Sequence, residues 1–149
     1  MAEEIERKFL VTGDGWQEGV TERRAFRQFY LARSDSATVR VRITDDSSAR
    51  LTVKGNRAGA ARPEYEWDIP VEDAREMEAL AAGRVLVKTR HVVPAGALAW
   101  EVDVFDDGLT LAEIEVPDAE ASFERPDWLG EEVTDDPSYY NAAMALEQG

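Results

Sequence analysis

The chain has 149 residues, of which 44% are hydrophobic and 32% are charged, a size and composition typical of a single domain with its own core. It contains no cysteine, which excludes disulfides, thiolate metal sites and cysteine nucleophiles. The acidic start, Met1 to Glu6, does not resemble a signal peptide, and no apolar stretch approaches the roughly 20 residues of a membrane helix. We therefore expect one cytoplasmic domain spanning residues 1–149, with no membrane partner.

The net charge of −14 is unevenly distributed. Residues 1–90 hold 16 basic and 16 acidic side chains, whereas residues 91–149 hold only Arg125 against 15 acids. This overall acidity argues against a nucleic-acid partner. The three lysines, Lys8, Lys54 and Lys88, each lie in a short segment where polar and apolar residues alternate, which indicates special positions.

Eight such alternating segments predict strands with one polar and one apolar face. In chain order they cover residues 4–11, 28–31, 38–43, 51–54, 62–69, 85–90, 100–104 and 112–116. Turn signals at 45–48 and 106–108 predict short connections, and 55–59 predicts a flexible loop. Helical patterns occupy 16–20, 71–82 with Gly83 as a C-terminal stop, and 136–145.

These elements predict an α+β fold, an eight-stranded antiparallel β-barrel with flanking helices. If the apolar faces pack outward under the helices, the charged faces line a hydrated interior, because unpaired buried charges are costly. His91 shares a strand face with the apolar residues Val85 and Val87, so we expect a surface or packing role for it outside the charged interior. The four tryptophans are expected to anchor the core and a lid: Trp16, Trp67, Trp100 and Trp128.

A charged lining of this kind suggests a ligand and a metal. Converging Lys and Arg side chains suit a compact polyanion such as a triphosphate. The carboxylates on the same faces would repel phosphate unless a cation intervened, and oxygen ligands favour Mg²⁺ or Mn²⁺. Asp103 and Arg62 could equally hold the lysines and arginines in place. Glu101 and Asp68 are assigned structural roles, while Gln28 and Tyr30 face the charged side.

The sequence Glu4-Ile5-Glu6-Arg7-Lys8 resembles the ExExK signature of the CYTH superfamily, the triphosphate tunnel metalloenzymes. Further segments resemble motifs of that family in the same order: 38–42, 52–55, 64–66, 88–90, 100–103, 112–115, 133–134 and 139–141. The resemblance implies an eight-stranded tunnel that binds triphosphate through Lys and Arg and a divalent metal through Glu. The short, single-domain bacterial members imply hydrolysis of inorganic tripolyphosphate to pyrophosphate and phosphate, with water as the nucleophile.

On this basis each residue receives an expected role. The catalytic group is Lys8, Glu64, Glu66 and Lys88, in which the two glutamates orient the water. The substrate-binding group is Lys8, Arg40, Arg42, Lys54, Arg62, Lys88 and Arg90. The metal group is Glu4, Glu6, Glu113, Glu115 and Asp103.

Three other functions remain open from the sequence. The same tunnel could serve a class IV adenylate cyclase, or a hydrolase of an organic triphosphate such as thiamine triphosphate or a nucleoside triphosphate. It could also be a polyphosphate-binding module without turnover, although pure anion binding would not need so many carboxylates. The expected partner is a small polyanion, and the expected assembly is a monomer or homodimer.

Overall fold

The computed structural model describes residues 3–147. Its strands are β1 (Glu3–Val11), β2 (Glu22–Arg33), β3 (Ala37–Thr44), β4 (Ser48–Gly55), β5 (Ala61–Ile69), β6 (Ala82–Ala95), β7 (Leu98–Phe105), β8 (Thr110–Glu115) and β9 (Leu129–Glu132). The helices are α1 (Val71–Met77) and α2 (Asn141–Leu146), with 3₁₀ turns η1 (Gly15–Gly19), η2 (Glu78–Leu80) and η3 (Pro137–Tyr139). None of the helices in this range is long and apolar enough to cross a bilayer.

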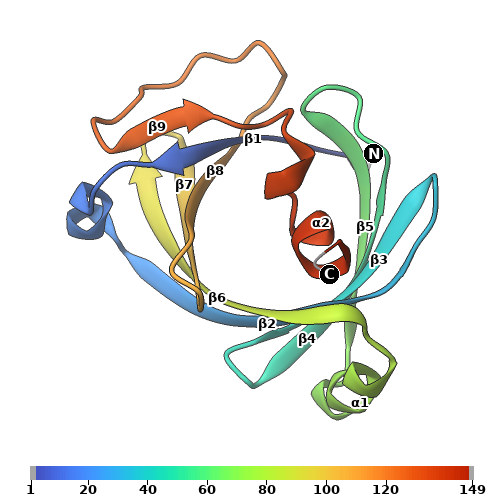
Figure 1. Cartoon of the computed structure of the whole chain (residues 1–149). Coiled ribbons are helices and arrows are strands. Elements are labelled where there is room, and N and C mark those ends of the chain that lie inside the picture. The colour runs from blue at the N-terminus through green and yellow to red at the C-terminus, as the bar shows by residue number, and fades with distance from the viewer. Residues whose placement is uncertain (1–2, 148–149) are drawn as a thin grey trace.

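Eight antiparallel strands close into a barrel, as the alternation predicts (Figure 1). The order β5-β4-β3-β2-β6-β7-β8-β1 is completed by pairing between β1 and β5, which places Glu4 opposite Arg62. The ninth strand, β9, pairs only with the end of β1 and lies outside this ring. Since closure joins the two outermost strands of the sheet, the two faces of every barrel strand become an inside and an outside.

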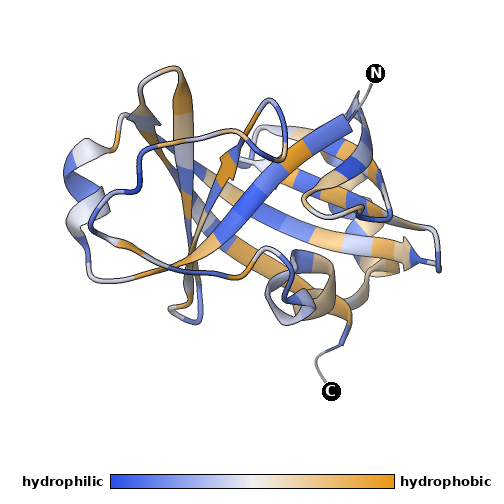
Figure 2. Ribbon diagram, turned by 90° about the horizontal axis from the view of Figure 1, so that it is seen from above, coloured by the Kyte–Doolittle hydropathy of each residue, from blue (hydrophilic) through white to orange (hydrophobic). Residues whose placement is uncertain are grey.

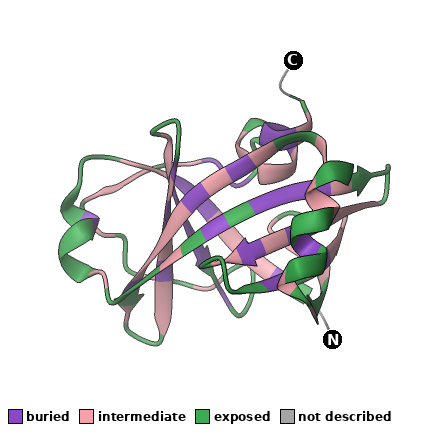
Figure 3. Cartoon of the chain, turned by 90° about the horizontal axis from the view of Figure 1, so that it is seen from below, coloured by how far each residue is buried: buried purple, intermediate pink, exposed green. Residues whose placement is uncertain are grey.

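Much of the outer face is apolar, and two parts of it are covered by short helices and loops. Helix α1 lies against β3 and β4 on the outside of the barrel (Figure 3). Its Ala74 belongs to a buried cluster with Phe29, Val41 and Ile43. On another side of the barrel, Trp16 of η1 belongs to a buried cluster with Phe9, Val93, Trp100, Val102, Ala112 and Ile114. The alternation of apolar and polar residues along the strands is visible as changing colour in Figure 2. The predicted outward direction of the apolar faces is confirmed.

For the last helix, the sequence predicts a flanking position that closes one mouth of the tunnel, and the structure places α2 further inside. Viewed along the barrel, it lies within the ring of strands (Figure 1). Its residues Met144 and Ala145 pack against a buried apolar cluster of Tyr30, Leu86, Phe105 and Leu111. By strand parity these residues share faces with the charged side chains, so part of the barrel interior is apolar and is filled by α2.

Three local predictions are wrong: the end of the helix at 71–82, the role of Gly83 as its stop, and the burial of Trp67. The helix at 71–82 ends earlier, as α1 and then η2 stop at Leu80, and Gly83 belongs to β6. Gly83 has a left-handed φ of 69°, and a Cβ there would lie 2.1 Å from the Ala145 carbonyl oxygen, so glycine permits the close approach of α2. Trp67 is 54% exposed on the outer face of β5 and anchors nothing. Trp16 and Trp100 are buried, and Trp128 packs on Trp100.

Candidate active site

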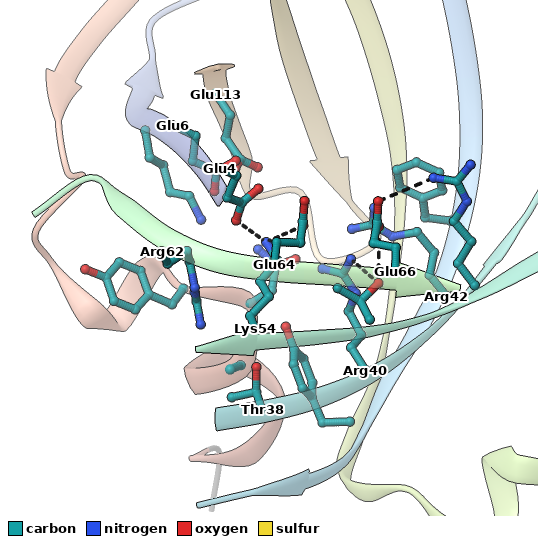
Figure 4. Close-up of a pocket in the computed structure, with 18 of the residues that line it drawn as sticks. Glu4, Glu6, Thr38, Arg40, Arg42, Lys54, Arg62, Glu64, Glu66 and Glu113 are labelled. Atoms are coloured by element: carbon teal, nitrogen blue, oxygen red, sulfur yellow. Dashed lines mark hydrogen bonds and ion pairs between the residues drawn. The ribbon is translucent and has the colours of Figure 1, made fainter. Parts of the chain in front are cut away.

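The strand registers bring the predicted residues to one cavity of about 780 Å³. Directly opposed pairs on its wall include Glu6 with Glu115 and Lys8 with Glu113, between β1 and β8. Of the fourteen side chains expected to act, all but Asp103 line this cavity. Figure 4 shows that labelled members from β1, β3, β4, β5 and β8 face a common space. The charged faces of the strands therefore line one shared interior, as the alternation predicts.

Lys54 on β4 is the cation around which two carboxylates converge (Figure 4). Its Nζ donates a short hydrogen bond to Glu4 of β1 and lies 3.4 Å from Glu64 Oε2 of β5. Both contacts are shielded from solvent, since Lys54 is 15% exposed and Glu4 8%. Shielded charge pairs of this kind interact more strongly than surface pairs, so this side of the cavity has a fixed arrangement of charge.

Asp103 on β7 lies behind the cavity wall and holds two of its cations. Its Oδ2 accepts a hydrogen bond of 2.7 Å from Lys88 Nζ, and its Oδ1 accepts one of 2.8 Å from Arg90 Nε. Burial lowers the pKa of Lys88 to about 7 even though Asp103 opposes the shift. Burial would raise the pKa of Asp103, but attraction to Arg90 and Lys88 lowers it overall. Asp103 is thus an ionised counterion that sets the direction of both side chains.

The arginines of β3 crowd together on the same wall. Burial, together with repulsion from Arg40 and Arg90, lowers the pKa of Arg42 to about 9, which still leaves Arg42 charged at neutral pH. Its Nε donates to Gln28 Oε1 at 2.8 Å, and the Gln28 amide donates to Asn141 Oδ1 at 2.9 Å. Neutral groups therefore connect this arginine to the start of α2. The adjacent like charges favour binding of an anion between them.

The carboxylates form an opposing group. Burial raises the pKa of Glu115, and the nearby Glu4, Glu6 and Glu64 raise it further. For Glu6, burial alone would raise the pKa, but attraction to Lys54 and Lys8 and a hydrogen bond with Glu113 outweigh it, so the pKa is lowered. A divalent cation would relieve the repulsion among these side chains, and an all-oxygen donor set suits a hard metal.

The donor chemistry thus fits Mg²⁺ or Mn²⁺, although within residues 3–147 no three carboxylate or histidine side chains are already gathered as a formed metal cluster. Two cations instead neutralise the carboxylates. Lys54 engages Glu4, and Arg57 Nη2 lies 3.6 Å from Glu6 Oε1. Metal binding at Glu4 and Glu6 therefore requires that these contacts be exchanged.

Some residues that border the cavity were missed or set aside in the sequence. Arg57 follows β4 in a loop, where no periodicity can indicate its direction. Glu101 lines the cavity 3.3 Å from Arg90, although it was assigned a structural role. Its parity with Asp103 was the available signal. Gln28 and Tyr30 are both buried on the inner side, and His91 packs against Trp16 outside the cavity, as expected.

Three buried donor atoms on the cavity wall have no hydrogen-bond partner. Among the residues that the structure describes, the buried side-chain nitrogen and oxygen atoms without a hydrogen-bond partner are Arg40 Nε, Arg57 Nε and Arg57 Nη1. All three belong to guanidinium groups that border this cavity. Folded proteins rarely leave such donors unpaired, so their concentration here indicates an anion-binding site.

The charge of the lining supports this interpretation. Eleven Lys and Arg side chains and eight Glu side chains border the cavity, so its wall carries an excess of positive charge. The whole chain carries −14. The acidic excess therefore lies elsewhere on the molecule, and the cavity attracts anions within an otherwise anion-repelling protein.

Comparison with known proteins gives a consistent result. A family model described as CYTH domain matches residues 2–142. An inorganic triphosphatase of Acetivibrio thermocellus is 43% identical over 148 residues, which cover 97% of this chain and 94% of that protein. An inorganic triphosphatase of Nitrosomonas europaea is 38% identical over 150 residues, covering 96% and 97%. A crystal structure of an inorganic triphosphatase, at 35% identity, superposes with a TM-score of 0.70 and covers 96% of this chain and 97% of the other.

Proposed function

Because this chain belongs to the CYTH domain family, we propose that it catalyses the metal-dependent hydrolysis of inorganic tripolyphosphate. The observation that carries the proposal is the set of unpaired guanidinium donors on Arg40 and Arg57, which border a cavity with excess positive charge. Phosphate oxygens match such donors in geometry and charge. The two related inorganic triphosphatases, which cover nearly the whole chain, support the choice of substrate.

The chain's own residues divide into an anion-binding and a water-orienting group. Phosphate oxygens would be bound by Lys8, Arg40, Arg42, Lys54, Arg62, Lys88 and Arg90. Asp103 keeps Lys88 and Arg90 directed into the cavity through the hydrogen bonds described above. Glu64 and Glu66 on β5 would orient a water molecule and take its proton. Glu66 already accepts a hydrogen bond of 3.2 Å from Thr52 Oγ1.

In the reaction, the water oxygen forms a bond to the terminal phosphorus while the bridging P–O bond breaks, and pyrophosphate leaves. Positive charge from Lys8 and Lys88 stabilises the charge that develops on the leaving oxygens. A divalent cation, which we propose to be Mg²⁺ or Mn²⁺ held by Glu4, Glu6, Glu113 and Glu115, would supply further charge neutralisation at the phosphate oxygens. Asp103, which the sequence also places in the metal group, is left out, because it lies behind the cavity wall and both its oxygens bind Lys88 and Arg90. A cytoplasmic location and a monomeric or homodimeric state stay predictions from the sequence.

A phosphate-release assay tests the proposal. The full chain is incubated with tripolyphosphate, ATP or thiamine triphosphate, each with Mg²⁺, with Mn²⁺ and with EDTA, and free phosphate is measured by malachite green. Metal-dependent release that is fastest from tripolyphosphate is the expected result. Faster release from an organic triphosphate, formation of cyclic AMP from ATP, or binding of tripolyphosphate without product would each contradict it.

A further inference from the structure

Arg57 is held inside the cavity by a short loop between β4 and β5. The backbones of Ala58 and Ala61 bond to each other in both directions, at 2.7 and 3.2 Å, and Gly59 takes a left-handed φ of 66° that allows the tight turn. The loop therefore has a defined shape of its own. It directs the Arg57 side chain inward, where only 14% of that side chain is exposed.

The contacts of Arg57 leave much of its hydrogen-bonding capacity unused. Its guanidinium carbon lies 4.4 Å from the centre of the Tyr140 ring, and its Nη2 lies 3.6 Å from Glu6 Oε1, beyond hydrogen-bond range. Its Nε and Nη1 are buried and have no partner within residues 3–147. A buried donor without a partner is unfavourable, and more so when it carries charge. Such a group is stabilised when an anion binds to it.

Tyr140 places Arg57 beside a second cation. The Tyr140 hydroxyl donates a hydrogen bond of 2.9 Å to the Thr134 carbonyl oxygen, which fixes the ring. Lys8 Nζ lies 5.8 Å from the centre of the same ring and donates to the Tyr139 carbonyl oxygen at 2.9 Å. One aromatic ring thus contacts both cations, which matches the known preference of Arg and Lys for aromatic faces.

We propose that Arg57 is a further phosphate-binding residue, which binds one end of the polyphosphate next to Lys8, and that Tyr140 is the positioning residue that holds it there. This inference rests on the proposed function and assigns a loop residue to the substrate site. The planar guanidinium offers its unpaired Nε–H and Nη1–H groups to different phosphate oxygens, in fixed directions that the single ammonium group of lysine cannot reproduce.

The contact with Glu6 gives the proposal a second, opposite consequence. In the structure Arg57 neutralises part of the charge on Glu6, a carboxylate proposed to hold the metal. Loss of the Arg57 charge therefore weakens phosphate binding but does not weaken the binding of a divalent cation. A variant that merely disturbed the fold around the loop would weaken both.

The test measures the two ligands separately. Binding of tripolyphosphate in EDTA is followed by calorimetry, and binding of Mn²⁺ alone is followed by the electron paramagnetic resonance of free Mn²⁺. The variants are Arg57→Gln, Arg57→Lys and Tyr140→Leu. Arg24→Gln is the charge-matched control, because Arg24 borders the cavity but is already bonded to Glu22 at 2.8 Å.

For Arg57→Gln we expect the Kd for tripolyphosphate to rise at least about tenfold, the loss of one charge-assisted hydrogen bond, while Mn²⁺ binds as tightly as before or more tightly. Arg57→Lys should recover part of the affinity, Tyr140→Leu should lose about threefold or more, and Arg24→Gln should lose less than Arg57→Gln. Wild-type affinity in Arg57→Gln, an equal loss in the control, or a parallel loss of Mn²⁺ binding would overturn the inference. If the wild-type chain itself fails to bind tripolyphosphate, the proposed function falls as well.

Discussion

Replacement of Asp103 by Asn tests the buried charge arrangement most directly. The substitution keeps the shape of the side chain but removes the carboxylate that bonds to Lys88 at 2.7 Å and to Arg90 at 2.8 Å. Removal of one member of a buried ion pair costs about 3–5 kcal/mol, and we expect about 3 kcal/mol because Asn can still accept a hydrogen bond. For a chain of this size that corresponds to a fall of about 6–12 °C in Tm.

The same substitution should make the loss of stability depend on pH. Lys88 has a pKa of about 7 in the folded protein and an ordinary value of 10.5 when unfolded. Its contribution to stability therefore falls as the pH drops from 10.5 to 7 and is constant below 7. Without Asp103 the folded pKa lies lower still, so the fall continues below pH 7, by up to about 1.4 kcal/mol per pH unit.

Urea denaturation of both proteins at several values between pH 5 and pH 8.5 measures this difference. Asp103 itself does not complicate this range, because the stability that its lowered pKa contributes is present above the ordinary value of 3.8 and is lost only as the pH falls below that value. The double variant Lys88→Met with Asp103→Asn removes the titrating amine and should abolish the additional pH dependence. A difference in free energy that stays constant across the range would refute the assignment of Asp103 as the counterion of Lys88.

Three further changes test the site and the fold. Glu113→Gln and, separately, Glu115→Gln should lower metal-dependent phosphate release by more than about 100-fold while circular dichroism and Tm show an intact fold; unchanged turnover in both would count against the metal assignment. Arg42→Ala should raise the KM for tripolyphosphate about tenfold or more through the loss of a charged donor, with a KM equal to wild type as the contradicting result. Gly83→Ala should destabilise by about 2 kcal/mol or more, because its positive φ is unfavourable and the added Cβ would meet the Ala145 carbonyl; a Tm equal to wild type would show that α2 can shift without cost.

The barrel strands were predictable because they are long enough for several polar and apolar residues to alternate. Residues 38–43 and 62–69 each carry several polar and apolar positions in strict order, and both lie within strands of the structure. The four residues of β9 contain Gly130 and no such alternation, and they form a strand only because the end of β1 offers a free edge. Short elements of this kind depend on their partner, which local sequence does not reveal.

The place of α2 could not be predicted for a related reason. Its apolar residues, such as Met144 and Ala145, indicate that one face is buried but not against which surface. The matching apolar positions are spread over four strands, among them Leu86 and Phe105, and they share parity with the charged residues. Only the structure shows that these apolar residues form a cluster at one part of the interior, next to the charged lining, and that α2 packs against it.

The site residues on strands could be predicted, whereas the one in a loop could not. Side chains on strands could be assigned to the interior by parity, which succeeds for Arg40, Lys88 and Glu113 because closure of the barrel turns one shared parity into one shared space. Parity has no meaning in a loop, so Arg57 remained undetected despite its position against Glu6. For Glu101 the parity was available but not used. Its parity indicates an inward side chain, and the structure places it on the cavity wall, although the sequence analysis assigns it a structural role.

Closure through β1 and β5 explains why a chain so rich in acids can offer an anion site at all. On an open sheet the inner charges would face solvent, where each pair is screened and contributes little. Pairing of Glu4 with Arg62 across the closing register confines the cations of β3, β4 and β6 to a shielded space. There burial, together with like charges, lowers the pKa of Arg42, and donors of Arg40 and Arg57 stay unpaired. The proposed anion would satisfy these unpaired donors, so the closure that completes the fold also assembles the proposed binding site.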